Sequence, residues 1–289
     1  MKKCPLCDST QYEVLYDLSE STVHGSITLP GIIKKCNNCS LMYKDFTKSI
    51  SEVYGSSYAD LFQGLEGYSD SDHSKKFFKD ILIKGKSKIE EKENPVLLDV
   101  GSAMGTTLDI GKELGFQTKG VEISANLALK AKEKGHEIFN CDISEIDSKE
   151  KFDVISMFDI IEHLVDPKEV LINLKNMLKS NGQIIVYTPN HDSLVVKIAH
   201  ILYKLGFKNG ADNIFACPHT IFFTTKTLKR IMTESGFEIS EVDQFKYDSS
   251  RPGQQLSSTV KFFMDLIESV GSVLGYKGYR VVIYATTPN

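Results

Sequence analysis

From Val96 onward, short apolar runs alternate with amphipathic helical patterns, and this order constrains the fold more than any other feature. The apolar runs are VLLDVG, QTKGVEI, HEIF, FDVISMF and GQIIVYTP, and the helical patterns include SANLALKAKEKG and DPKEVLINLKNMLKSNG. Strands that alternate with helices pair in parallel, because each helix returns the chain to the same end of the sheet. The sequence therefore predicts an α/β fold with a Rossmann-like sheet covered by helices on both faces.

The loop after the first of these strands is predicted to lie at the carboxyl edge of the sheet, where open α/β sheets bind ligands. Asp99, Gly101, Ala103 and Gly105 fit a D-x-G-x-G-x-G pattern whose middle glycine is replaced. Glycine lets the backbone approach a ligand closely, and the next helix directs its amide groups and positive dipole end toward an anionic group. The loop alone is weak evidence, and the alternative is a tight strand-to-helix turn that binds no ligand.

Acidic residues follow the next two strands. Glu122 lies in KGVEIS, about 20 residues beyond the glycine loop, where a carboxylate typically accepts hydrogen bonds from ribose hydroxyls. Asp142 lies in FNCDIS, where a carboxylate can accept a hydrogen bond from an adenine amino group. Taken singly, each acid is better explained as a surface charge or a helix N-cap. Their placement after consecutive strands favours a nucleoside site.

Four of the six cysteines form two CxxC pairs near the N-terminus. Cys4 and Cys7 belong to CPLC, and Cys36 and Cys39 belong to CNNC. Two such turns supply the four thiolates of a closed, tetrahedral structural zinc site, so residues 1–45 are expected to form a zinc-ribbon-like module. Unrelated cysteine pairs, labile disulfides, or iron in a rubredoxin-like knuckle are the alternatives. The remaining cysteines, Cys141 and Cys217, are expected to be buried small side chains.

The segments LLDVGSAMG, GVEIS, CDI, FDVISMFDIIEHLVDP and LKNMLKSNGQIIVYTPN follow one another in family order, and over residues 94–289 the chain resembles the class I S-adenosylmethionine-dependent methyltransferases. The resemblance implies a seven-stranded sheet with a reversed last strand, for which GYRVVIYATTP is the candidate. Gly101 and Gly105 would then face the methionine end of the cofactor, Glu122 the ribose, Asp142 the adenine and Phe158 the sulfonium. The expected cofactor-binding residues are Asp99, Gly101, Ser102, Gly105, Glu122, Ile123, Asp142, Ile143 and Phe158. Ala103 departs from the family's usual glycine, which is expected to tighten the loop without excluding the cofactor.

Methyl transfer to an alcohol also requires that the alcohol lose its proton, either to a base or through a metal that lowers its pKa. Asp159, Glu162 and His163 follow the fourth strand in FDIIEHL, at helical positions that share one face, and His219 occurs later in PHTIFFT. The arrangement resembles the E-x-x-E-H site of small-RNA ribose methyltransferases and some quinone O-methyltransferases. Two mechanisms stay open. One uses a second divalent cation, Mn²⁺, Co²⁺ or Zn²⁺, and the other a histidine base, for which His191 is a further candidate.

The charge and the apolar content of the sequence limit which classes of partner are expected. A formal net charge of −4 and a pI near 6.0 give no general attraction for a polyanion, so no nucleic acid partner is expected. No apolar run reaches the length of a membrane span, and MKKCPLC has no apolar signal core, which favours a cytoplasmic location. The oligomeric state stays open.

The zinc ribbon, the methyltransferase core and the EHLxDP segment together resemble bacterial enzymes that modify sugars and other small hydroxylated metabolites. We therefore expect O-methylation of a small molecule, with a sugar or nucleotide sugar of polysaccharide or natural-product biosynthesis as the acceptor. The alternatives are a quinone O-methyltransferase, an RNA methyltransferase, and a non-catalytic cofactor-binding module. RNA is considered because CPLC modules also resemble a ribosomal guanine methyltransferase family. The [DNS]-P-P-[YFW] signature of amino-directed base methyltransferases does not follow FDVISM.

The rest of the chain is expected to shape the acceptor site. Residues 46–93 are predicted to be a linker and an N-terminal helical region, and lid insertions are predicted near residues 191–218 and 254–275. The first insertion places Lys197, His200 and Lys204 on one helical face, and the second has an apolar stripe through Phe263, Ile267, Val270 and Leu274. Core or lid helices are the expectation, and docking to a membrane surface or a lipid-linked substrate is the alternative.

Overall fold

The structure, a computed structural model, describes residues 3–19, 31–46, 71–146, 149–207, 214–215, 219–246, 258–276 and 278–288. The strands are β1 (Tyr12–Asp17), β2 (Gly31–Cys36), β3 (Met42–Phe46), β4 (Val96–Val100), β5 (Gln117–Val121), β6 (Glu137–Phe139), β7 (Phe152–Phe158), β8 (Leu178–Pro189), β9 (Ile221–Phe222), β10 (Glu238–Phe245) and β11 (Arg280–Thr286). The helices are α2 (Asp72–Lys86), α3 (Thr106–Glu113), α4 (Ala125–Glu133), α5 (Pro167–Met177), α6 (Leu194–Lys204), α8 (Thr225–Glu234) and α9 (Ser258–Val273), with 3₁₀ turns η2 (Ile143–Glu145) and η3 (Ile161–His163).

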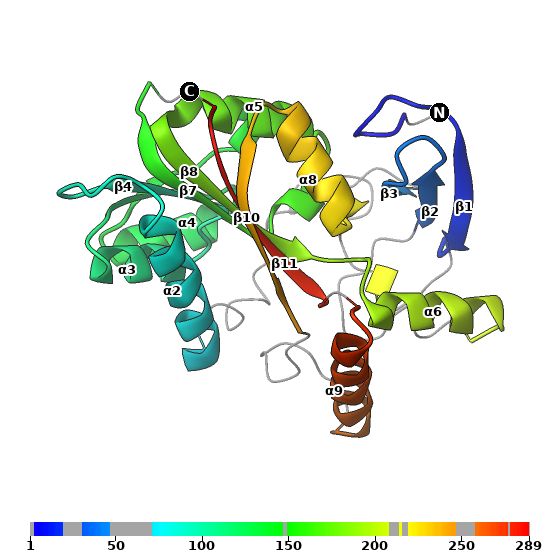
Figure 1. Cartoon of the computed structure of the whole chain (residues 1–289). Helices are drawn as coiled ribbons and strands as arrows, with labels where there is room; N and C mark the ends of the chain where they lie inside the picture. Colours follow the sequence, from blue (N-terminus) through cyan, green and yellow to red (C-terminus); the bar gives the residue numbers. More distant parts are fainter. Residues whose placement is uncertain are drawn as a thin grey trace.

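Seven strands form the main sheet in the order β10-β11-β8-β7-β4-β5-β6 (Figure 1). The neighbours from β6 through β8 pair in parallel, whereas β11 pairs antiparallel with both β8 and β10. The predicted Rossmann-like sheet is confirmed, and GYRVVIYATTP forms its reversed strand. The carboxyl ends of β4, β5, β6 and β7 therefore lie along one edge, which is where the predicted site residues follow the strands.

The main sheet is buried on both faces. Along β4, Leu97 and Leu98 point to opposite faces, because successive side chains alternate across a strand. Helices α5 and α8 cover one face, and α2 covers the other with Phe78, Ile81 and Leu82 (Figure 1). The core under α5 and α8, here called the α5–α8 core, includes the helix residues Val170, Leu171, Leu174, Leu228, Ile231 and Met232.

The boundary between α5 and β8 differs from the sequence expectation. The helical pattern was expected to continue through Gly182, but α5 ends at Met177 and Leu178 already pairs with Phe152 of β7. The register then shifts, and Asn181 takes the left-handed conformation with φ 60°. A left-handed residue cannot continue a right-handed helix, so KSNG forms an irregular start of the strand.

A smaller antiparallel sheet, here called the N-terminal sheet, has the order β1-β2-β3-β9. Its fourth strand comes from far along the chain, since Met42 pairs with Phe222 and Tyr43 with Ile221. Cys4, Leu6 and Leu41 of the cysteine turns and Tyr43 of β3 belong to the α5–α8 core, and in Figure 1 the sheet lies beside α8. The N-terminal sheet and the main sheet thus share one continuous apolar core.

The two predicted insertions contain α6 and α9, which contact each other. Helix α6 is attached to β1, because His200 Nδ1 lies 2.9 Å from the Tyr16 hydroxyl and the backbone N–H of Asp17 donates to Tyr203. Several large apolar side chains on these helices and the residues that follow them are exposed: Ile201, Leu202, Leu205, Phe207, Phe262, Leu266, Val270, Val273 and Leu274. The Phe263 side chain, Cys217 and residues 47–70 lie outside the described residues. Within the described ranges, no helix has both the length and the apolar character needed to span a bilayer.

Candidate functional site

The loop between β4 and α3 is built on three residues with left-handed backbones. Gly101, Ala103 and Gly105 have φ values of 75°, 45° and 83°. A Cβ atom on Gly101 would lie 2.1 Å from Cδ1 of Ile160, and one on Gly105 would lie 2.7 Å from Cδ2 of His136. Both glycines are therefore required by backbone conformation and by space, whereas Ala103 adopts a conformation that side chains disfavour.

Glu122 fastens this loop to the end of β5. One carboxylate oxygen accepts from the backbone N–H of Ala103 at 2.9 Å, and the other accepts from that of Ser124 at 2.8 Å. The side chain is buried, and burial raises its pKa. Glu122 directly follows β5, and its bond to Ala103 is a loop-shaping contact that the sequence did not predict.

Buried polar groups lie beneath the glycine loop. Asp99 accepts from the hydroxyl of Ser156 at 2.6 Å, and burial raises the pKa of Asp99 to about 7. The hydroxyls of Ser102 and Thr106 are buried and have no hydrogen-bond partner within the described residues. Buried hydroxyls without partners are rare in folded proteins, so a polar ligand in this loop would satisfy groups that the protein leaves unpaired.

The remaining expected cofactor residues lie along the same edge of the sheet. Asp142 caps η2 by accepting from the backbone N–H of Ser144 at 2.8 Å, which is the N-cap role considered as its alternative. Ile143 is buried behind it, whereas Ile123 is 46% exposed at the end of β5. Phe158 stacks on Phe78 with ring centroids 5.0 Å apart. The edge of the sheet therefore has the apolar side chain of Ile123 after β5, the Asp142 carboxylate after β6, and the Phe158 ring at the end of β7.

Glu162, His163 and His219 come together beyond the end of β7. One potential ligand atom from each lies within 4.8 Å of the others, and the two imidazole centroids are 4.8 Å apart. Asp159 does not join them, because it has a left-handed backbone with φ 56° and forms an ion pair with Arg280 of β11. The shared helical face expected for Asp159, Glu162 and His163 is not formed, since only Ile161–His163 are helical and the turn is 3₁₀.

Within the described residues, few polar groups stabilise a charge on the Glu162 carboxylate. The Glu162 side chain is 1% exposed, and neither carboxylate oxygen makes a well-formed hydrogen bond within the described residues. The Thr188 hydroxyl is a weak donor nearby, and His219 Nε2 lies 4.0 Å from Oε1 of Glu162. Burial, with the nearby charge of Asp159, raises the pKa of Glu162 to about 8. Burial, with the charge of His163, lowers the pKa of His219 well below its ordinary value. Two imidazoles and one carboxylate form a donor set that suits Zn²⁺, Mn²⁺ or Co²⁺.

His191 occupies a different environment from the cluster. It is buried between Phe222 and Phe215, and its Nδ1 lies 3.3 Å from the carbonyl oxygen of Phe223. Burial lowers the pKa of His191 to about 3, so the ring is neutral at physiological pH. A base with so low a pKa removes protons poorly, which makes His191 a weak candidate for proton transfer.

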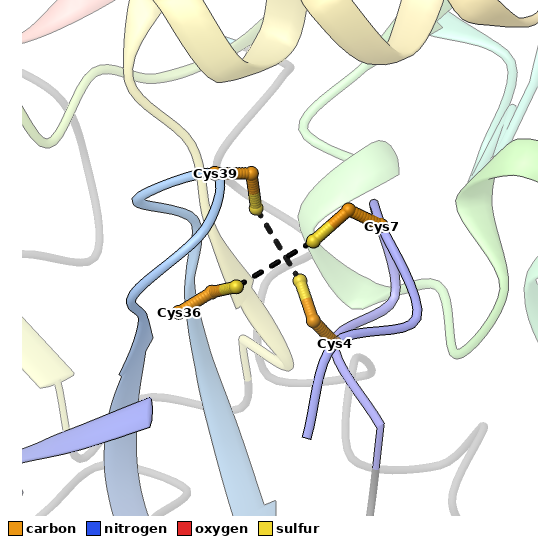
Figure 2. A group of neighbouring side chains, drawn as sticks. All are labelled: Cys4, Cys7, Cys36 and Cys39. Carbon is orange, nitrogen blue, oxygen red and sulfur yellow. Dashed lines mark hydrogen bonds between the residues drawn. The ribbon is translucent and has the colours of Figure 1, made fainter. Parts of the chain in front are cut away.

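The four N-terminal cysteines converge on one point (Figure 2). The sulfurs of Cys4 and Cys39 lie 3.4 Å apart, and those of Cys7 and Cys36 lie 3.5 Å apart. Both turns have the same construction, in which a left-handed residue follows the second cysteine, Asp8 or Ser40. Four sulfurs bound tetrahedrally to zinc at about 2.3 Å would be about 3.8 Å apart, close to these distances.

Two contacts at the site were not predicted from the sequence. Arg280 is the only charged residue in β11, and that isolation within an apolar strand was the one available signal. The second is Thr220, whose backbone N–H donates to the carbonyl oxygen of Glu162 at 2.8 Å. Its position next to His219 gave no indication of this bond.

Comparisons with known proteins show that the chain is similar to methyltransferases in sequence and in overall fold. The Ubiquinone biosynthesis O-methyltransferase of Rickettsia felis is 26% identical over 182 residues, which cover 59% of this chain and 72% of that enzyme. A chain from the complex between the Haloferax volcanii Trm112 methyltransferase activator and a methyltransferase has a TM-score of 0.55 at 11% identity, covering 83% of this chain and 98% of its own. A SAM-dependent methyltransferase from Archaeoglobus fulgidus has a TM-score of 0.50 at 23% identity, covering 78% and 98%.

The family model described as "Methyltransferase domain" matches residues 75–242, which include the glycine loop and the strands that carry Glu122, Asp142 and Phe158. This match spans more than half of the chain, and the seven-stranded sheet has the topology that the family requires. The protein therefore belongs to the methyltransferase domain family and is a class I S-adenosylmethionine-dependent methyltransferase.

Proposed function

We propose that the enzyme methylates a hydroxyl group of a small molecule, and that the acceptor is a quinol- or catechol-like ring hydroxyl. The support for an oxygen acceptor comes from the relatives, which are named as O-methyltransferases of ubiquinone biosynthesis. The sugar acceptor expected from the sequence finds no support in these relatives. The net charge of −4 continues to disfavour RNA.

When bound, S-adenosylmethionine supplies a methyl group on a sulfonium, which the acceptor oxygen attacks in line. We propose that residues 101–105 hold the methionine end of the cofactor, with the Ser102 hydroxyl as a donor. Glu122 accepts from the ribose and Asp142 from the adenine amino group. A carboxylate has about four lone-pair sites, so Glu122 can keep its two backbone donors while it accepts from a ribose hydroxyl.

The observation that carries the mechanism is the buried Glu162–His163–His219 cluster. We propose that it binds a divalent cation, which lowers the pKa of the acceptor hydroxyl. The two unpartnered carboxylate oxygens of Glu162 support this assignment, because a cation would compensate a charge that is otherwise costly to bury. The lowered pKa of His219 supports it as well, since a neutral imidazole is a good metal ligand and a poor base at pH 7.

We further propose that residues 1–45 form a zinc-ribbon-like module in which Cys4, Cys7, Cys36 and Cys39 bind one structural zinc. The convergence of four sulfurs from two similar turns supports the proposal. The ion would have no open coordination position and therefore no direct part in methyl transfer.

The acceptor class is tested with methyl-labelled S-adenosylmethionine and three probes: 3,4-dihydroxybenzoate, UDP-glucose and total RNA. We expect label in the dihydroxybenzoate only. Label in UDP-glucose would restore the sugar acceptor, and label in RNA would contradict the small-molecule assignment. Reactions without the enzyme serve as the background for each probe.

The cation is tested by measuring turnover after chelation mild enough to spare the ribbon zinc, and again after Mn²⁺, Co²⁺ or Zn²⁺ is restored. We expect turnover to fall on chelation and to recover with at least one of these ions. Unchanged turnover would eliminate the cation and leave a histidine base. Full activity in both His163→Ala and His219→Ala would contradict both mechanisms.

A further inference from the structure

Thr220 connects the proposed cation site to the N-terminal sheet. Its backbone N–H donates to the carbonyl oxygen of Glu162 at 2.8 Å, and its hydroxyl lies 3.0 Å from that oxygen and 2.7 Å from the carbonyl oxygen of Leu164. On its other side, its carbonyl oxygen accepts from the backbone N–H of Lys44 in β3 at 2.9 Å. Thr220 is 1% exposed, so these bonds are shielded from water.

The strand that contacts Thr220 begins at one of the two cysteine turns. The backbone N–H of Cys36 donates to the carbonyl oxygen of Leu41 at 2.9 Å, which closes the turn that contains Cys39. From there β3 runs along β9 and reaches Thr220, the neighbour of His219. A short series of backbone hydrogen bonds therefore leads from the cysteine cluster to the residue that joins His219 to η3.

The cation site needs such support because its own elements are short. Glu162 and His163 lie in a 3₁₀ turn of three residues, which has no side-chain cap at its start. Short 3₁₀ turns have poor hydrogen-bond geometry and hold their shape only through their surroundings. Displacing a ligand by about 1 Å can cost about 100-fold in rate, so the turn and His219 have to be fixed relative to each other.

We propose that Thr220 is a positioning residue, and that the N-terminal sheet, shaped by its cysteine cluster, holds Thr220 so that His219 faces Glu162 and His163. The inference depends on one part of the proposed function, the assignment of Glu162, His163 and His219 as the cation site. It gives the N-terminal module a task in catalysis that requires no contact with cofactor or acceptor.

Hydrogen exchange of the segment 159–164, read by mass spectrometry in the full chain, tests the connection itself. Thr220→Val removes the hydroxyl without changing the shape of the side chain, and Thr220→Ser retains it. The control is Thr286→Val, which removes a hydroxyl bonded to the carbonyl oxygen of Gly182 at the far end of the sheet. We expect about 10-fold faster exchange in Thr220→Val only. Unchanged exchange would overturn the proposal, whether or not the enzyme has the proposed acceptor.

Mn²⁺ titration, followed by the electron paramagnetic resonance of the free ion, tests the consequence for the site. We expect the Kd for Mn²⁺ to rise about 10-fold in Thr220→Val and to stay within about 2-fold in Thr220→Ser and Thr286→Val, with S-adenosylmethionine affinity unchanged. A wild-type protein that binds no Mn²⁺ would exclude this ion from the site, and the exchange experiment would still decide the positioning role. If Mn²⁺ binds Thr220→Val as it binds the wild type, the positioning role is wrong.

Cys36→Ser tests the contribution of the N-terminal sheet. At a temperature where this variant remains folded, we expect faster exchange in segment 159–164 than in Cys141→Ser, a substitution of a cysteine outside the cluster. Equal exchange in the two variants would show that Thr220 acts without the cysteine cluster, and would overturn that part of the proposal.

Discussion

Two buried glutamates at the same edge of the sheet differ in what compensates their charge. Glu122 accepts from two backbone N–H groups, whereas Glu162 makes no well-formed hydrogen bond within the described residues and has only weaker neighbours, the Thr188 hydroxyl and His219 Nε2 at 4.0 Å. Leaving a buried polar group unpaired costs about 1 to 3 kcal/mol. Glu122 is thus part of a finished loop, whereas the proposed cation would compensate Glu162 in a way that the described residues do not.

The first prediction follows from the raised pKa of Glu162. The folded-state pKa, about 8, lies above the ordinary value of 4.5, so the folded protein holds this proton more tightly and stability falls as pH rises between the two values. Glu162→Gln removes the titrating group. We expect the variant to match the wild type at pH 5 and to be more stable by about 1 to 3 kcal/mol at pH 8, both freed of weakly bound cations.

Denaturant unfolding at the two pH values measures the difference. Glu137→Gln, which replaces an exposed glutamate, is the control, and its free energy of unfolding should equal that of the wild type at pH 5 and at pH 8. A Glu162→Gln protein that loses stability at pH 8 would show that the carboxylate is compensated in the folded state. The same variant should have little methyl-transfer activity, because the cation would lose its only carboxylate ligand.

The second prediction concerns Glu122. Glu122→Ala removes the proposed ribose acceptor and also releases the N–H of Ala103, so both the ligand and the loop lose a partner. We expect S-adenosylmethionine binding to weaken by about 1 to 3 kcal/mol, or roughly 5- to 150-fold in Kd, measured by calorimetry. Glu137→Ala should bind normally. Binding of NAD by the wild type, with no affinity for the sulfonium cofactor, would refute the assignment of the glycine loop.

At the residue scale, the sequence predicted features that depend on a residue's own backbone, and it did not predict contacts between residues far apart in the chain. The glycine pattern predicted Gly101 and Gly105 because backbone conformation is encoded by the residue itself. The α-helical turn that was expected to place Asp159 and Glu162 on one face does not form, because only Ile161–His163 are helical and the turn is 3₁₀. The competing ion pair comes from Arg280, 121 residues away, and spacing along the chain carries no information about such a contact.

At the element scale, long periodic segments were predictable and short ones were not. The strands from β4 to β8 have apolar runs that identify them, and their order implies a parallel sheet. Strand β9 has two residues and no pattern of its own, so its pairing with β3 depends entirely on tertiary structure. This pairing is one of the contacts that join the N-terminal sheet to the segment containing His219 and Thr220.

The third prediction belongs to that module. Native mass spectrometry and elemental analysis should find one tightly held zinc per chain. Cys36→Ser should lose the metal and lower the melting temperature, with little effect on S-adenosylmethionine affinity, because closed zinc sites contribute to folding rather than to ligand binding. Cys141→Ser should retain the zinc. A metal-free protein whose N-terminal region is fully folded would contradict the zinc site.

At the scale of the whole molecule, the two sheets are joined by a single apolar core. Leu6, Leu41 and Tyr43 from the N-terminal region are buried in the same cluster as Leu228 and Ile231 of α8. Separating the regions would expose these side chains, and each fully buried one contributes about 1.5 to 3 kcal/mol. The structure therefore favours cooperative unfolding of the N-terminal module together with the methyltransferase fold.

The last prediction tests this cooperativity by following two events during one thermal ramp. Zinc release, detected with a metal-binding dye, reports on the N-terminal module, and far-ultraviolet circular dichroism reports on the main sheet. We expect both midpoints to coincide. A concentration of S-adenosylmethionine 100-fold above its Kd stabilises the folded state by about 2.7 kcal/mol, which should raise both midpoints together by about 4 °C.

The cofactor is proposed to bind on the main sheet, far along the chain from the cysteines, so a shift in zinc release would arise through contacts between the two regions, such as the shared core and the β3–β9 pairing. Leu41→Ala weakens that core, and should bring zinc release below the unfolding of the main sheet while cofactor affinity is retained. Zinc release at a lower temperature in the wild type, insensitive to the cofactor, would mean that the module unfolds independently. It would also leave the N-terminal sheet too loosely attached to position Thr220.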